Sequence, residues 1–135
     1  MGKLNKILVA HNFIERYEKY ANEAYKAEQL YWHMSQSVWR TEEHIKLLND
    51  IIHYAENANA IYDCAFMVGI KGLVDILTDI ETRLQKSYDS THDIDGLIGL
   101  AHHHFTTFGD YKKVDAEHRE RIARLEQEVM DLKGV

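Results

Sequence analysis

The sequence contains no proline, one cysteine and only seven glycines among its 135 residues. Because proline breaks helix interiors and marks turns, its absence predicts long helices joined by short connections. A lone cysteine, Cys64, cannot form an intrachain disulfide, so we expect a reducing, cytoplasmic location. Lys3 and Lys6 are followed by too short an apolar run for a signal peptide, and none is expected.

Long apolar runs are also missing. The most apolar window, 60–74, is interrupted by Asp63 and Lys71, so the sequence predicts no membrane-spanning segment. The net charge is −6, with acidic and basic residues interleaved, which argues against general electrostatic binding of nucleic acid. The phosphate-binding loop, the dinucleotide-binding glycine pattern and the CxxC pair are absent as well. The length predicts a single domain, residues 1–135, that is large enough to bury a core.

What the sequence does contain is helical periodicity. Apolar residues recur at helical spacing in five segments: 4–35, 41–68, 73–84, 94–108 and 110–132. We expect Thr41 to cap the second helix, Gly69 to end it, and Gly109 with Asp110 to separate the last two helices. The chain is expected to turn at residues 35–37. This pattern predicts an all-α fold, an antiparallel four-helix bundle with a short extra helix between its second and third long helices.

Polar residues that interrupt these apolar stripes are the candidates for function. Glu28 lies on the stripe of the first helix, and the second helix carries His44 and a polar file at Glu56, Asn59 and Asp63. A buried carboxylate needs a cation, a metal or a proton, so Glu28 is expected either to ligate a metal or to make an interhelical salt bridge or a hydrogen bond to a tyrosine. His44 is expected to be buried, to have a polar partner and to be neutral at pH 7, because a helix N-terminus disfavours positive charge.

Further histidines fall on the stripes of the later helices. His104 and His118 could converge with His44 on zinc, iron or copper, although each one alone is more typical of a core histidine. Cys64 lies in an apolar helix between an acid and an alanine, and we expect it to be a small core residue rather than a nucleophile. The last helix carries an apolar stripe that is expected to face the bundle, with i,i+4 pairs of glutamate and arginine on its outer face.

The stretch from Trp32 to Gly69 has a more specific spacing. It is carried by six residues: Trp32, His33, His44, Asn59, Asp63 and Gly69. The segment resembles the second-helix region of ferritin-like proteins, especially the Dps mini-ferritins. That family shows a His-Trp pair, a second histidine, two acids one helical turn apart, and a glycine that closes the helix. Here the pair is reversed, and Asn59 stands where the first acid is expected.

The resemblance implies a ferritin-like bundle with an altered ferroxidase site, as in some small phage-encoded and accessory proteins. It implies a site for a transition metal, iron or zinc, formed by His33, His44, Glu56 and Asp63 with Glu28 in support. In a Dps-like arrangement the histidines come from one subunit and the acids from its two-fold mate, so the site requires a dimer. The short helix at 73–84 is similar to one that Dps proteins carry.

The other interpretation, which we favour, is a non-enzymatic interaction module that self-associates and binds a protein partner. Bulky aromatic residues provide large contact area with few rotatable bonds. The residues expected at this interface are Tyr17, Tyr25, Tyr31, Trp32 and Trp39. We regard them as too many for one small monomer to bury, which predicts a homodimer or larger homo-oligomer. Phosphotransfer by an exposed histidine of the fourth helix is a third alternative, although Phe105-Thr106-Thr107 follows where lysine and glycine are expected.

Overall fold

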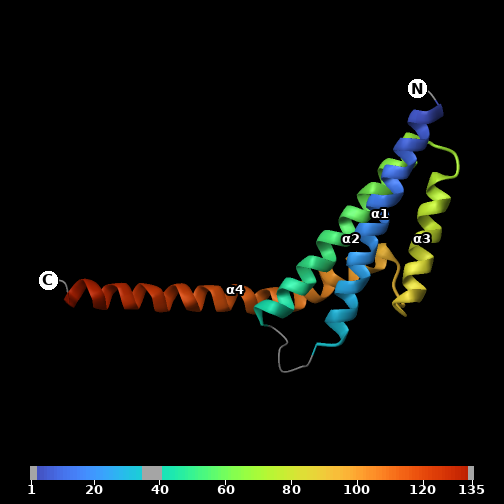
Figure 1. Cartoon of the computed structure of the whole chain (residues 1–135). Helices are drawn as coiled ribbons and strands as arrows, with labels where there is room; N and C mark the ends of the chain where they lie inside the picture. Colours follow the sequence, from blue (N-terminus) through green and yellow to red (C-terminus); the bar gives the residue numbers. More distant parts are fainter. Residues whose placement is uncertain (1–2, 35–40, 134–135) are drawn as a thin grey trace.

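The computed structural model of the chain describes residues 3–34 and 41–133, with side chains at 4–34, 41–107 and 119–131. The described residues form four α-helices, shown in Figure 1: α1 (Lys3–Trp32), α2 (Glu42–Val68), α3 (Leu73–Ser87) and α4 (Ile94–Lys133). The predicted all-α fold is confirmed for this part of the chain. Across the same ranges, no helix combines the length and the apolar character needed to cross a membrane.

The first three helices form the body of the molecule. α1 and α2 run antiparallel, and α3 follows in the direction of α1, against which it packs (Figure 1). The beginning of α4 packs mainly against α2, and the rest of α4 leads away from the body. The expected short helix between longer neighbours is therefore present as α3.

The core lies between α1, α2, α3 and the start of α4. Alanines at Ala21, Ala24, Ala55 and Ala58 are fully buried, and small residues of this kind let helices approach closely. The large core side chains are Tyr17, Tyr25, Tyr31, Ile45, Leu48, Ile51, Leu73, Leu77 and Leu97. The prediction that these three tyrosines form an interface is wrong. The chain buries their rings itself, because the alanines leave volume for them between the helices.

The ends of α2 follow the sequence prediction. Thr41 is the N-cap, and its Oγ1 accepts a hydrogen bond from the His44 backbone N–H at 3.4 Å. Gly69 closes the helix with φ 71°, and its N–H donates to the Ala65 carbonyl at 3.3 Å. The predicted turn at 35–37 and the interface candidate Trp39 lie outside the described residues.

The predicted break at Gly109 and Asp110 is wrong, because α4 continues through both residues to Lys133. A glycine inside a helix costs only about 1 kcal/mol relative to alanine, and long helical runs on both sides outweigh that. We call residues 119–133 of α4 the stem. Since α4 does not turn back at Gly109, the stem projects from the body instead of packing on it (Figure 1).

Candidate functional site

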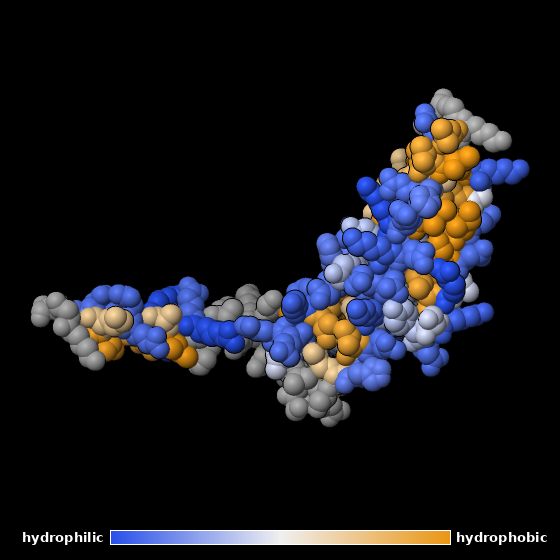
Figure 2. All heavy atoms as spheres, in the orientation of Figure 1, coloured by the Kyte–Doolittle hydropathy of each residue, from blue (hydrophilic) through white to orange (hydrophobic). Residues whose placement is uncertain are grey.

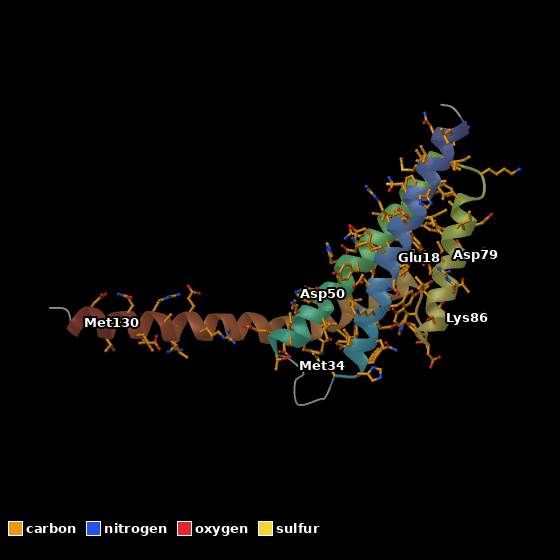
Figure 3. The ribbon with its side chains drawn as sticks, viewed as in Figure 1. Glu18, Met34, Asp50, Asp79, Lys86 and Met130 are labelled. Carbon is orange, nitrogen blue, oxygen red and sulfur yellow. The ribbon has the colours of Figure 1, made fainter. Side chains whose placement is uncertain are left out.

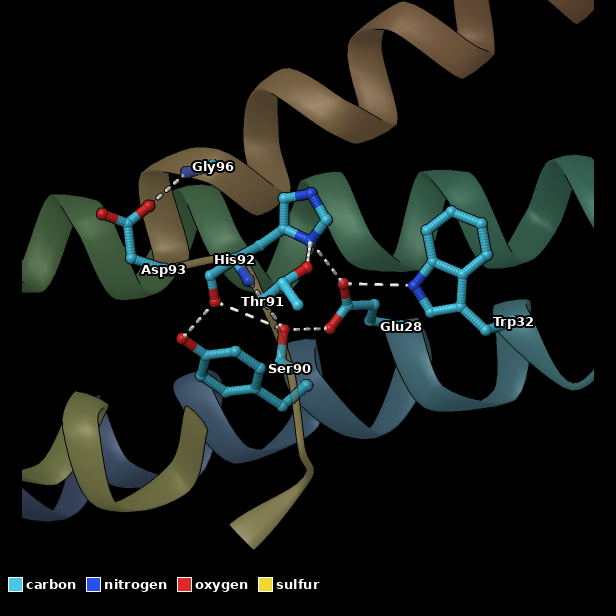
Figure 4. A network of polar contacts seen from close by, with 8 residues as sticks. Glu28, Trp32, Ser90, Thr91, His92, Asp93 and Gly96 are labelled. Atoms are coloured by element: carbon cyan, nitrogen blue, oxygen red, sulfur yellow. Dashed lines mark hydrogen bonds and ion pairs between the residues drawn. The ribbon is translucent and has the colours of Figure 1, made fainter. Parts of the chain in front are cut away.

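Glu28 on α1 is buried, with 3% of its surface exposed, and faces the segment that links α3 to α4 (Figure 4). Ser90 Oγ donates to its Oε1 at 2.6 Å. His92 Nδ1 lies 3.1 Å from Oε2, and the indole Nε1 of Trp32 donates to the same oxygen at 3.3 Å. Both carboxylate oxygens therefore have hydrogen-bond donors from within the chain.

The backbone of the linking segment belongs to the same network. Tyr25 on α1 donates its hydroxyl to the His92 carbonyl at 3.1 Å, and the His92 N–H donates to Ser90 Oγ at 3.1 Å. The hydrogen bonds that Ser90 and His92 make to the Glu28 carboxylate are stronger than bonds between neutral groups. They hold the linking segment firmly against α1. Glu28 is therefore paired within the chain, but its partners are Ser90 and His92 in the link and Trp32 on α1, and not the expected tyrosine or interhelical partner.

An open cavity of about 360 Å³ lies beside this network. It is lined by Glu28, Gln29, Trp32, His33, Tyr88, Asp89, Ser90 and Thr91. Ser90 donates to Glu28, whose other oxygen is bound by His92 and Trp32, so these side chains join the link to α1. The network supports a structural role for these residues.

A second polar cluster joins α1, α2 and α4 around Tyr31. The Tyr31 ring stacks on His44, with ring centroids 5.1 Å apart and 19° between the planes, and its hydroxyl is hydrogen-bonded to His104 Nδ1. Burial lowers the pKa of His44, and the nearby His104 lowers it further. Burial also lowers the pKa of His104, with a smaller contribution from His103. The prediction that His44 is buried is confirmed, and its lowered pKa favours the neutral imidazole, with burial and not the helix terminus as the main cause.

The other predicted metal ligands lie on the surface. His33 is exposed, and its Nδ1 is 2.7 Å from the Gln29 carbonyl. Glu56 is exposed and pairs with His102, whose Nε2 is 3.3 Å from Oε1. Asp63 is exposed further along α2, where it lines a cavity of about 330 Å³. These three residues face different surroundings.

Glu28 and His44 are buried in two separate clusters, so the five predicted ligands are dispersed over the chain. Within the described residues, no three histidines, cysteines, aspartates or glutamates are grouped so that they could hold a metal ion. His44 and His104 do meet, through Tyr31, while the His118 side chain lies outside the described residues. A metal site completed by a second copy stays a prediction of the resemblance.

Besides Leu30 and Trp32 near the end of α1, large apolar side chains are exposed in two places among the described residues (Figure 2). One is the stem, where Ile122, Leu125, Val129 and Met130 are 43%, 55%, 50% and 66% exposed. Figure 3 shows Met130 far from the other helices. The expectation that this stripe faces the bundle is wrong, because the stem has left the body. The other place is one end of the body, where the exposed residues are Leu4, Ile7, Leu8, Phe66, Met67, Val68 and Ile76.

Two further expectations concern single residues. Cys64 is exposed, so the prediction that it is a core residue is wrong. Trp32, the remaining interface candidate, is half-exposed, with its indole N–H bound to Glu28.

Comparison with known protein families, with curated proteins and with solved structures gives no match for this chain. Function is therefore inferred from the described residues themselves. They define an all-helical protein with a helical body, two buried polar clusters and a projecting stem that carries an exposed apolar stripe.

Proposed function

We propose that this chain is a non-enzymatic helical protein that acts by self-association, with the stem as its contact surface. One observation carries the proposal: every described side chain of the stem, 119–131, is exposed, although four of them are large and apolar. An isolated helix of this length is marginal in water, and most helical stability in proteins comes from packing an apolar face. A partner that covers the stripe would supply that packing.

A described contact between the stem and the body is consistent with this view, because it is an ion pair on the surface. Arg119 Nη1 lies 2.7 Å from Glu42 Oε1 at the start of α2, with both side chains largely exposed. Exposed ion pairs of this kind contribute little to stability. The same proposal includes three properties expected from the sequence: a ferritin-like four-helix arrangement, a cytoplasmic location and a homo-oligomeric state.

The test is the mass of the full chain in solution by light scattering, over a dilution series that starts at tens of micromolar. We expect a dimer or larger species that dissociates on dilution. Ile122→Glu, which places a charge in the stripe, should give a lighter species at each concentration. Ala123→Gln changes an exposed stem residue outside the stripe and should behave like the wild type. A monomeric wild-type mass at the highest concentration would overturn the proposal.

A further inference from the structure

We infer that the stem forms a parallel, two-stranded coiled coil, in register, with the stem of a second copy of this chain. The inference rests on the proposed self-association and adds the partner, the orientation and the register.

The apolar residues of the stem follow a heptad repeat. Ile122, Leu125, Val129 and Leu132 are separated by three, four and three residues. This is the spacing of positions a, d, a and d in a coiled coil, where each such residue inserts between four residues of the facing helix. The described members of the repeat are all exposed on a helix that no other helix covers.

The kind of apolar residue at each position indicates the strand number and orientation. Both a positions, Ile122 and Val129, are β-branched, and both d positions, Leu125 and Leu132, are leucine. β-branched residues at a with leucine at d favour parallel dimers, whereas isoleucine at d favours trimers or tetramers. The stem therefore has the side-chain pattern of a parallel pair.

The charges beside the stripe agree with pairing in register. Arg121 and Glu128 occupy the g positions, and Glu126 and Lys133 occupy the e positions. In a parallel dimer, each g residue faces the e residue five positions later on the other strand. Arg121 of one copy then faces Glu126 of the other, and Glu128 faces Lys133. Every such pair joins opposite charges.

The hydrogen bonds within the stem lie on its opposite side. Arg124 donates to Glu120 at 3.1 Å, and Gln127 donates to Asp131 at 2.9 Å. These four residues occupy positions c and f of the heptad, which face away from the partner strand in a coiled coil. Side-chain pairing within the helix thus stabilises its outer face and leaves the a, d, e and g positions for a second strand.

Disulfide crosslinking tests the orientation and the register. The native Cys64 is exposed, so the experiment uses a Cys64→Ser background of the full chain. In a parallel pair in register, each residue at position a faces the same residue of the other copy, and so does each residue at position d. Val129→Cys and Leu125→Cys should each form a covalent dimer when oxidised in a glutathione buffer. Gln127→Cys, on the outer face, should stay mostly monomeric on a non-reducing gel.

The possible failures are distinguishable. An antiparallel pair places a residues opposite d residues, so a mixture of the Val129→Cys and Leu125→Cys chains would crosslink while neither did so alone. That result would overturn the parallel arrangement and leave self-association standing. A monomeric wild type with no crosslink in any variant would overturn both.

A charge exchange gives a second test of the register. Arg121→Glu should weaken the dimer in light scattering, because it places like charges opposite each other. Adding Glu126→Arg in the same chain should restore most of the lost association. If the double variant associates no better than Arg121→Glu alone, the pairing of these two residues is wrong.

Discussion

Glu28 shows how a charged residue can lie inside a helical core. Its two oxygens are bound by Ser90, His92 and Trp32, so the carboxylate is buried with partners and not bare. The helical pattern was enough to identify Glu28 and His44 as buried polar residues. It could not identify Ser90 or His92, because they lie in a link without periodicity and meet Glu28 only through the fold.

Replacing Glu28 should destabilise the protein. Glu28→Ala leaves Ser90 and His92 without their acceptor, and we expect the free energy of unfolding to fall by about 2–4 kcal/mol. Urea unfolding followed by circular dichroism measures this change. Glu15→Ala, which removes an exposed carboxylate beside His11, is the matched control and should shift the midpoint little. Equal midpoints for the two variants would contradict the role given to Glu28.

The buried His44 and the half-buried His104 predict a pH dependence of stability. Burial lowers the pKa of His44 and His104 in the folded protein below the ordinary value of 6.5. Between the lowered values and 6.5 the unfolded chain binds more protons than the folded one. Stability is therefore fully present above pH 6.5 and is lost as the pH falls through the folded pKa values. Thermal unfolding at a series of pH values should show the melting temperature falling across this window.

A variant assigns this pH dependence to the cluster. His104→Asn keeps an acceptor for the Tyr31 hydroxyl but cannot titrate, so the melting temperature should fall less steeply between pH 7 and 5. His53→Asn changes an exposed histidine and should leave the slope as in the wild type. An unchanged slope in His104→Asn would show that the cluster is not its source.

At the scale of helices, replacing two different glycines by alanine is expected to change stability in opposite directions. Gly69 ends α2 with φ 71°, and a Cβ there would contact nothing within 4 Å, so only the backbone conformation opposes a side chain. Gly69→Ala should cost about 1–2 kcal/mol. Gly99 lies inside α4, also with nothing within 4 Å, and Gly99→Ala should stabilise by up to about 1 kcal/mol. Thermal unfolding of both variants should show shifts of opposite sign.

The helices also show how far the sequence predicts this fold. The limits of α2 were predictable because Thr41 and Gly69 are local signals that act through their neighbours. The continuity of α4 was not, because a glycine signals a helix end only when its backbone adopts positive φ, which depends on packing. The same error placed the stripe of the last helix inside the bundle. Periodicity identifies an apolar face but not what covers it.

For the whole molecule, the apolar residues divide into a buried set and an exposed set. The tyrosines of α1 fill the core of one chain, so they do not argue for a partner. The stem does, because its stripe lies outside the body. Association is therefore expected to depend on the last turns of α4, while folding of the body depends on α1, α2, α3 and the first part of α4.

Truncation separates these two properties. A chain of residues 1–121 keeps the Arg119 contact with Glu42 and removes the stripe from Ile122 onward. A partner that binds only the folded state raises the melting temperature as its concentration increases. The melting temperature of the full chain should therefore rise with protein concentration, and that of the truncated chain should not.

The two chains should converge at high dilution, because the stem contributes nothing to the core of the body. Differential scanning calorimetry over a concentration series provides the comparison, with Ala123→Gln in the full chain as the control that keeps the stripe. A truncated chain that fails to unfold cooperatively would show that the body needs the stem. A concentration-dependent melting temperature in the truncated chain would place the contact surface on the body, where the exposed apolar end formed by α1, α2 and α3 would be the next surface to test.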